Sequence, residues 1–191
     1  MKWKFLSQLI HAAFAIVLLG VASTTEIWAQ TNVPSWISYE GPLGGIVKGL
    51  AHDPTSNILY TATNGGVFQK NLNDNNPWTL LTNNNGLANI NLYSILISNN
   101  VLYAGSNGGG VFQKNLNGTN PWELLVANNS GLTNLFINSM IVSNNILYVG
   151  TNNGVFQKNL TDTNPWTAVA NNTGLNNRGV FSMILANNIL Y

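Results

Sequence analysis

Few side chains in this sequence belong to the types that carry out acid–base or nucleophilic chemistry. The chain has no cysteine, which excludes thiol catalysis, disulfides and thiolate metal sites. The acids beyond residue 29 are spread along the chain: Glu40, Asp53, Asp74, Glu123 and Asp162. Because glycoside hydrolysis needs two carboxyl groups that face each other, we expect these scattered acids to be solvated turn or strand residues.

Histidine and arginine are equally sparse. His52 is the single histidine beyond residue 29, and beside Asp53-Pro54 it is expected to cap a turn. A metal site needs several ligands at set spacing, so we predict neither a metal nor a cofactor. Arg178 is the single arginine of the chain. These residue types predict that the chain is not an enzyme.

Lysine recurs with a period. Lys70, Lys114 and Lys158 stand 44 residues apart and could form an arc of positive charge for an anionic sugar. Solvated strand ends are the alternative, which we favour because the charges beyond residue 29 cancel. The same balance leaves no basic stripe for phosphates, so nucleic acid is not an expected partner.

Charged residues are rare in this sequence, and asparagine is abundant. Charged residues make up 7% of the chain, against a typical value of about 25%, whereas asparagine occurs 34 times. Asparagine-rich chains can be disordered, but here the asparagines fall in clusters between apolar runs. Since 45% of the residues are hydrophobic, the sequence predicts an ordered protein with a buried core.

The periodic lysines belong to a longer repeat. The sequence Gly-Val-Phe-Gln-Lys-Asn-Leu occurs three times, and a Pro-Trp pair follows each copy. The copies are Gly66–Leu72, Gly110–Leu116 and Gly154–Leu160. Tandem repeats of this length indicate stacked supersecondary units.

Each repeat contains short β-type runs bounded by turn residues, with no sustained helical period. The runs of the middle repeat are Leu92–Ile97, Val101–Ala104, Val111–Lys114 and Trp122–Val126. Asn99-Asn100 separates the first two, and a two-residue loop able to adopt positive φ predicts an antiparallel hairpin. Pro121 opens the fourth run, which fits an outer edge strand. A repeated four-stranded meander is typical of a β-propeller blade.

A family resemblance agrees with this interpretation. The string Ile146–Phe156 resembles the repeat of sialidase-like (BNR or Asp-box) bacterial β-propellers, and the resemblance covers residues 34–191. In that family the turn before the tryptophan reads Ser-x-Asp-x-Gly-x-Thr-Trp, whereas here Asn71–Trp78 keeps the tryptophan alone. Sialidase catalysis, as the resemblance would imply it, needs an arginine cluster, a tyrosine nucleophile and acid/base carboxylates, whereas this sequence has a single arginine and scattered acids.

The predicted organisation is an export signal followed by an incomplete propeller. Residues 1–29 read as a signal peptide, whose apolar run Ala12–Ala22 is shorter than the about 20 residues that span a bilayer. The fold class is all-β, with about three full blades of four antiparallel strands plus partial ones. The predicted parts of residues 30–191 are an orphan outer strand at 34–39, blades at about 41–82, 86–127 and 131–170, and a partial blade at 174–191.

A binding surface can be predicted by comparing the repeats with one another. In the loop that leads into the first run of each repeat, one position is apolar in all copies, and the positions on either side of it differ between copies. Exposed positions that differ between copies are free to contact a ligand. These positions converge at one mouth of the predicted channel. The candidate ligand-binding residues are Lys48, Asn91, Tyr93, Phe136, Asn138, Arg178 and Phe181.

The function predicted from the sequence is that of a binding or interaction scaffold without catalysis of its own. Export would place it in the periplasm, outside the cell or on the cell surface, with no membrane insertion of the mature chain. Aromatic and amide side chains suit a carbohydrate or a protein or peptide ligand. Part of a glycan-active, sialidase-like enzyme and the sensor propeller of a signalling protein are the alternatives.

Overall fold

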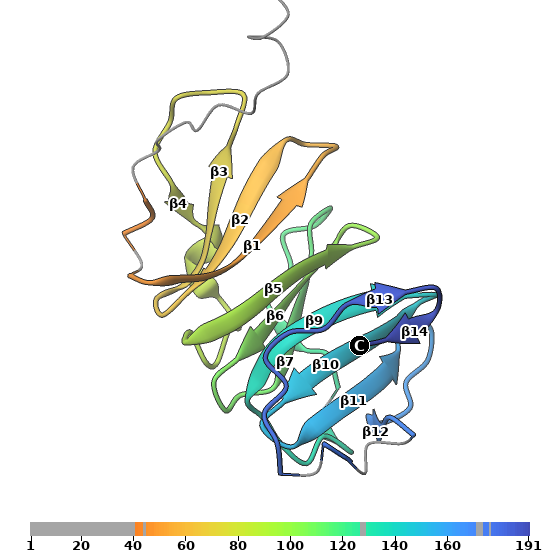
Figure 1. Cartoon of the computed structure of the whole chain (residues 1–191). Helices are drawn as coiled ribbons and strands as arrows, with labels where there is room; N and C mark the ends of the chain where they lie inside the picture. The colour runs from red at the N-terminus through yellow and green to blue at the C-terminus, as the bar shows by residue number, and fades with distance from the viewer. Residues whose placement is uncertain (1–40, 44, 127–128, 171–173, 176) are drawn as a thin grey trace, which may run out of the picture. The chain divides into compact units, whose positions relative to one another are not determined.

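The computed structural model describes residues 41–191 except 44, 127–128, 171–173 and 176 (Figure 1). The predicted signal peptide and the predicted outer strand at 34–39 lie outside the described residues. Glu40–Tyr191 form one compact unit.

The described chain is built from antiparallel β-sheets, three of them four-stranded meanders with the strands in chain order (Figure 1). The first sheet contains β1 (Val47–Asp53), β2 (Ile58–Thr63), β3 (Gly66–Asn71) and β4 (Thr79–Leu80). The second contains β5 (Leu92–Ser98), β6 (Val101–Ser106), β7 (Val111–Asn115) and β8 (Glu123–Leu124). The third contains β9 (Ile137–Ser143), β10 (Ile146–Thr151), β11 (Gly154–Asn159) and β12 (Thr167–Ala168). A two-stranded hairpin follows, β13 (Leu185–Ala186) and β14 (Ile189–Leu190).

The prediction of an all-β chain made of four-stranded antiparallel units is confirmed. Helical structure in the described residues is limited to short 3-10 turns, of which η1 (Leu81–Asn84) is fully described. The fourth strand of the second sheet is shorter than the predicted run Trp122–Val126. Just before this strand the Trp122 N–H donates to the Asn85 carbonyl at 2.8 Å, and just after it the Leu125 N–H donates to the Val111 carbonyl of β7 at 3.0 Å.

The asparagine pairs form the first hairpin turns, as predicted. Asn99 and Asn100 have φ values of 49° and 60°, and the pairs Asn144-Asn145 and Asn187-Asn188 adopt nearly the same values. Two successive residues at positive φ match the type I′ turn, whose twist fits that of the flanking strands. Asparagine tolerates this conformation better than other side chains that have a Cβ.

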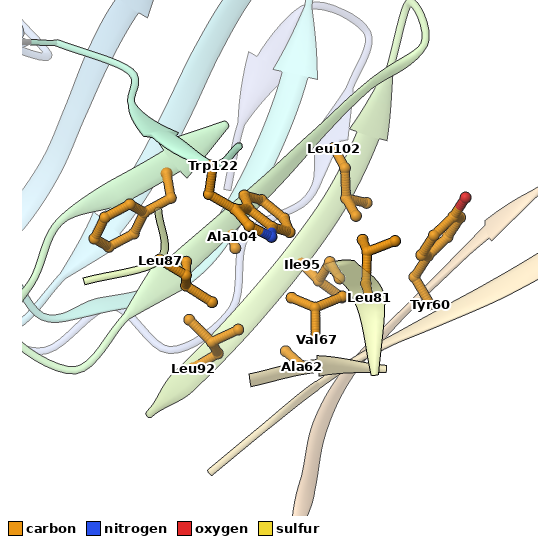
Figure 2. Packing of buried hydrophobic residues seen from close by; sticks show 11 residues of the cluster. Tyr60, Ala62, Val67, Leu81, Leu87, Leu92, Ile95, Leu102, Ala104 and Trp122 are labelled. Atoms are coloured by element: carbon orange, nitrogen blue, oxygen red, sulfur yellow. The ribbon is translucent and has the colours of Figure 1, made fainter. Parts of the chain in front are cut away.

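The core lies between successive sheets. In the first cluster, side chains of the first sheet point toward those of the second (Figure 2). Its members are Tyr60, Ala62, Val67, Leu81, Leu87, Leu92, Ile95, Leu102, Ala104, Phe112 and Trp122. A second cluster places residues of the same repeat columns between the second and third sheets: Tyr103, Val111, Leu132, Ile137, Leu147, Val149, Phe156 and Trp166. One interface is therefore built twice.

The linker between two sheets carries a glycine where it crosses a tryptophan of the following sheet, and this contact recurs in two repeats. Gly86 and Gly131 adopt φ values of +84° and +83°, and a Cβ on either would lie 2.0 Å from the carbonyl oxygen of Trp122 or Trp166. The indole rings of both tryptophans are 2% exposed. Any other residue at these glycine positions would push the linker away from the tryptophan that it covers.

A three-residue set controls how closely the first strands approach the neighbouring sheet. In the second sheet Ser94 pairs with Gly105, and a Cβ on Gly105 would lie 2.3 Å from Ser94 Oγ and 2.5 Å from Ile137 Cγ2. The first sheet has the opposite arrangement, Gly49 paired with Ala62, and Leu92, which is not branched at Cβ, at the position of Ile137. The first sheet thus carries a methyl group, that of Ala62, at the position of Gly105. It has neither the serine hydroxyl nor the β-branched side chain that would clash with this methyl group.

Gly105→Ala should lower the free energy of unfolding by about 2 kcal/mol, because the added methyl overpacks a filled site. Adding Ser94→Gly and Ile137→Leu recreates the set of the first sheet and should restore at least half of the loss. Urea unfolding midpoints measure both effects. Gly118→Ala is the matched control, since the nearest heavy atom to its Cβ would be Asn120 N at 3.9 Å. A Gly105→Ala variant as stable as this control would contradict the packing argument.

The periodic lysines are buried. Lys70, Lys114 and Lys158 are each 3% exposed. Lys70 Nζ donates to the carbonyl oxygens of Asp74 at 2.9 Å and of Asn76 at 2.6 Å, and the other two lysines bind carbonyl oxygens of the equivalent turns. Both interpretations from the sequence, solvated strand ends and an arc of positive charge, are therefore wrong. A buried ammonium group needs hydrogen-bond acceptors, and the turn before the tryptophan supplies them.

The turns that bind the three lysines differ in whether an aspartate carboxylate stands beside the ammonium group. Asp162 Oδ1 accepts a hydrogen bond from Lys158 Nζ at 2.8 Å in the third sheet. Gly118 stands at the equivalent position of the second sheet, where the described residues place no carboxylate within 4.0 Å of Lys114 Nζ. Burial lowers the pKa of Lys114. The second turn is thus held by carbonyl oxygens without a countercharge.

Gly118→Asp should raise the free energy of unfolding by about 1 kcal/mol, because the new carboxylate can accept from Lys114 Nζ and from the Asn120 N–H. Asp162 shows both bonds in the third sheet. Urea unfolding at pH 7 measures the gain, with Gly118→Ala as the uncharged comparison. If both variants are equally stable, the carboxylate does not support the turn.

Asp162→Asn should destabilise the protein at pH 7 and progressively less as the pH is lowered toward 2. The hydrogen bond from Lys158, reinforced by the Asn164 N–H, holds the pKa of the Asp162 carboxyl below its ordinary value of 3.8. A carboxyl with a depressed folded pKa stabilises the fold above its unfolded pKa, and this stabilisation disappears as the pH falls through the folded pKa. Urea midpoints across this range test the effect, and an equal deficit at every pH would contradict it.

Candidate functional site

One residue in the first strand of each sheet stands out of register. The pairing of β1 with β2 skips Lys48, that of β5 with β6 skips Tyr93, and that of β9 with β10 skips Asn138. Each is a β-bulge, a device that re-aims a side chain and often lies next to a functional site. Three of the predicted ligand-binding residues are therefore the bulge residues themselves.

The bulge residues of the first two sheets contact each other. Lys48 Nζ lies 3.6 Å from the centroid of the Tyr93 ring, a cation–π distance. It also donates a hydrogen bond to Asn91 Oδ1 at 3.1 Å. The lysine side chain thus lies across the bulge end where the first and second sheets meet.

The corresponding position between the second and third sheets is hollow. The cavity has a volume of about 270 Å³. Its lining combines aromatic rings with amides and contains no charged side chain: Tyr93, Ser106, Asn107, Phe136, Ile137, Asn138, Asn152 and Phe181. Tyr93 is 36% exposed, Phe136 44% and Phe181 72%. This is the candidate site.

A second hollow, of about 230 Å³, adjoins the first along the bulged strands. Three consecutive residues from each of four successive segments line it, and the first three triplets each begin at a bulge residue. These residues are Lys48, Gly49, Leu50, Tyr93, Ser94, Ile95, Asn138, Ser139, Met140, Phe181, Ser182 and Met183. Tyr93, Asn138 and Phe181 belong to both hollows, so the two form one continuous surface.

Two glycines make room for the aromatic rings of the candidate site. The loop between β6 and β7 carries an extra glycine relative to the other repeats, and Gly108, at φ +90°, lies with its Cβ position 3.9 Å from Phe136 Cζ. The Gly108 N–H donates to the Leu135 carbonyl at 3.0 Å, which ties this loop to the entry of β9. Gly179 lies under Phe181, where a Cβ would come within 2.7 Å of the ring.

The residues predicted from the sequence divide into three groups. Tyr93, Phe136, Asn138 and Phe181 line the candidate site, Lys48 lines the adjoining hollow and Asn91 binds Lys48. Arg178 lines neither hollow. That any of them binds a ligand stays a prediction.

Asn107 and Asn152 line the site but were not predicted. Asn138 Nδ2 donates to Asn152 Oδ1 at 2.9 Å. Comparison of the repeats missed them because Asn64, Asn107 and Asn152 are identical, and the comparison selected positions that differ. An asparagine that is identical in all repeats and stands beside variable positions would have identified these residues from the sequence.

A larger hollow, of about 510 Å³, lies where the outer part of the second sheet meets the lysine turn of the third. Its charged groups are Lys158 and Asp162, which bind each other. Because the fold already uses its cation, this hollow is a weaker candidate for a ligand.

Acids and metal ligands do not gather into a site in the described part of the chain. Asp53 accepts from the Thr55 N–H at 2.9 Å and from the Ser56 hydroxyl at 2.6 Å, bonds that lower its pKa. His52 Nε2 lies 3.0 Å from Asn57 Oδ1, in the turn that the sequence predicted it to cap. Groups of three or more His, Asp or Glu residues that could hold a metal ion do not occur in the described ranges. The helical structure described there lacks the length and hydrophobicity of a membrane span.

Comparison with known proteins gives a likeness of fold. No protein-family model and no curated protein sequence matches the chain. Among solved structures it is similar to the computationally designed Ika4 protein, with a TM-score of 0.58 and 15% identity over 83% of this chain and 90% of that one. It is also similar to an extracellular domain from B. thetaiotaomicron, described as that of the hybrid two component system BT4673, with a TM-score of 0.61 and 23% identity over 78% of this chain.

A second structure of an extracellular BT4673 domain, described as that of a one component system, gives a TM-score of 0.60 and 16% identity over 80% of this chain. This chain spans 20% of the length of either BT4673 structure. At these identities the chain shares an all-β fold with its structural neighbours.

Proposed function

We propose that this chain is part of an exported β-propeller that binds a ligand at the bulge end of its first strands and has no catalytic activity of its own. The observation that carries the proposal is the alignment of the bulge residues Lys48, Tyr93 and Asn138. A side chain re-aimed in every repeat, at positions where the repeats differ, indicates a surface that the scaffold does not need for its own packing.

The propeller arrangement is supported by the repeated interface. The first and second sheets pack face to face, and the second and third sheets do so through the same repeat columns. Blades of a propeller are four-stranded sheets arranged radially around a central channel. The small residues Gly49, Ser94 and Ser139 follow the bulges, where strands that converge on a channel need little bulk.

The proposal that the chain has no catalytic activity is supported by the local contacts of its acidic side chains. Each acid in the described residues takes part in a local contact, in a turn or with a strand neighbour. The contacts are those of Asp53 with Ser56, Asp74 with Asn76, Glu123 with Gln113 and Asp162 with Lys158. Glycoside hydrolysis would need two of them to face one another across a substrate.

Export is supported by the basic and apolar pattern of residues 1–29 and by the extracellular origin of the BT4673 neighbours. The same neighbours favour a second candidate function, the sensor part of a signalling protein. A glycan-active enzyme is a third possibility, and it would need an arginine cluster and paired carboxylates from further repeats.

Binding at the bulge end can be tested on arrays that carry both glycans and peptides, probed with the full 191-residue chain. The double variant Tyr93→Ala/Asn138→Ala should lose at least about fivefold in affinity for any ligand found, equivalent to about 1 kcal/mol. Tyr191→Ala is the control, because Tyr191 is 68% exposed and lines neither hollow. Array binding that survives the double variant, with its fold intact, would place the site elsewhere.

A further inference from the structure

The candidate site is specific to one junction of the repeat. Three departures from the other repeats meet there: the extra glycine of the loop between β6 and β7, Phe136 and Phe181. Asn107 forms an isolated β-bridge with Phe136, so the lengthened loop directly supports the strand entry that carries the ring. At the preceding junction Asn91 stands in place of Phe136, and Lys48 fills the space. The hollow is thus built by a set of linked changes.

The volume of the hollow limits the size of its occupant. Sites for drug-sized ligands have volumes from about 300 Å³ upward, and this one has about 270 Å³. It fits a single six-membered ring or one side chain.

The charge around the hollow disfavours ionic ligands. Its lining contains no carboxylate for a cation, and the ammonium group of Lys48, 3.6 Å from the Tyr93 ring, repels a second cation near that ring. The lining has no lysine or arginine that could bind an anion directly, and the Lys48 ammonium group beside it is already held by Asn91 Oδ1 and the Tyr93 ring. The free-energy penalty of removing the ligand from water is therefore smallest for a neutral ligand.

The polar atoms of the hollow can both donate and accept hydrogen bonds. In the bond from Asn138 Nδ2 to Asn152 Oδ1, Asn138 Oδ1 is still available as an acceptor and the Asn152 NH₂ group as a donor. Adjacent hydroxyl groups of a sugar, each both donor and acceptor, match such an amide pair. The C–H face of a pyranose ring matches the exposed aromatic rings.

A peptide fits less well, because the backbone around the hollow is already paired. Strand addition needs unpaired N–H and C=O groups along an edge. Here the Asn107 N–H donates to the Asn91 carbonyl at 2.8 Å, and the Gly108 and Gly110 N–H groups both donate to the Leu135 carbonyl. An extended peptide would find few main-chain partners at this mouth.

Building on the proposed function, we infer that the hollow between the second and third sheets binds one neutral pyranose ring, stacked on Phe136 and hydrogen-bonded by the Asn138–Asn152 pair. Tyr93 forms the far wall, and Lys48 positions its ring. Recognition of one ring with little enclosure implies weak binding per site, suited to the exposed residue of a larger glycan.

The test uses methyl glucoside, methyl galactoside and methyl mannoside, with glucuronate and glucosamine as charged relatives of the same ring, and the full chain as receptor. Saturation-transfer NMR should show at least one neutral glycoside receiving magnetisation through its ring C–H protons. Phe136→Ala should weaken that binding at least tenfold, and Tyr191→Ala should leave it unchanged. Circular dichroism and urea midpoints establish that each variant is folded.

The outcomes separate the two proposals. Array ligands that depend on Tyr93 and Asn138 but are all charged sugars or peptides would overturn the sugar inference and leave the binding surface in place. A neutral glycoside bound equally well by wild type and by Phe136→Ala would also overturn it. Failure of the glycosides together with array binding that ignores the Tyr93 and Asn138 variants would overturn both proposals.

Discussion

The burial of apolar sheet faces against neighbouring sheets is the interaction on which the described structure depends. A four-stranded meander of this length is too thin to hold a core of its own, and the buried side chains lie between sheets and not within them. The exposures show the dependence directly. Leu92 and Ile95, which pack on the first sheet, are 0% and 9% exposed, whereas their counterparts Val47 and Leu50 are 42% and 60% exposed. The residue types are alike, so the difference comes from the neighbour.

The interface also explains the unusual composition. Its close spacing demands glycine where the linker crosses a tryptophan, and exposed turns rich in asparagine join the strands. Asparagine supplies the turns with positive φ and with short hydrogen bonds to the backbone. Asn84 shows both roles, with φ 54° and a hydrogen bond from Nδ2 to the Gly65 carbonyl at 2.9 Å. A chain with few charges can therefore still satisfy its turns.

The sequence was sufficient for the strands and for most of the candidate surface, because both rest on local patterns. Asn99-Asn100 predicts its hairpin from the backbone preference of asparagine, and the variable flanks of the bulges predict Tyr93 and Phe136 from comparison of the repeats. The burial of Lys114 could not be predicted in this way. Its partners are carbonyl oxygens, which are present at every residue and leave no mark in a sequence. The bulges were missed for a related reason, since a one-residue slip in pairing depends on both strands together.

Under the proposed function, the closed junction at Lys48 limits the number of ligands that a chain could engage. The two junctions share one backbone plan, and the side chains at the bulge and beside it decide whether the space is filled from within or left open. If the open junction binds a ligand, the number of sites in a chain is therefore set by a few side chains that lie outside the two core clusters. For weak single-ring sites, the number that act together governs the avidity for a multivalent surface.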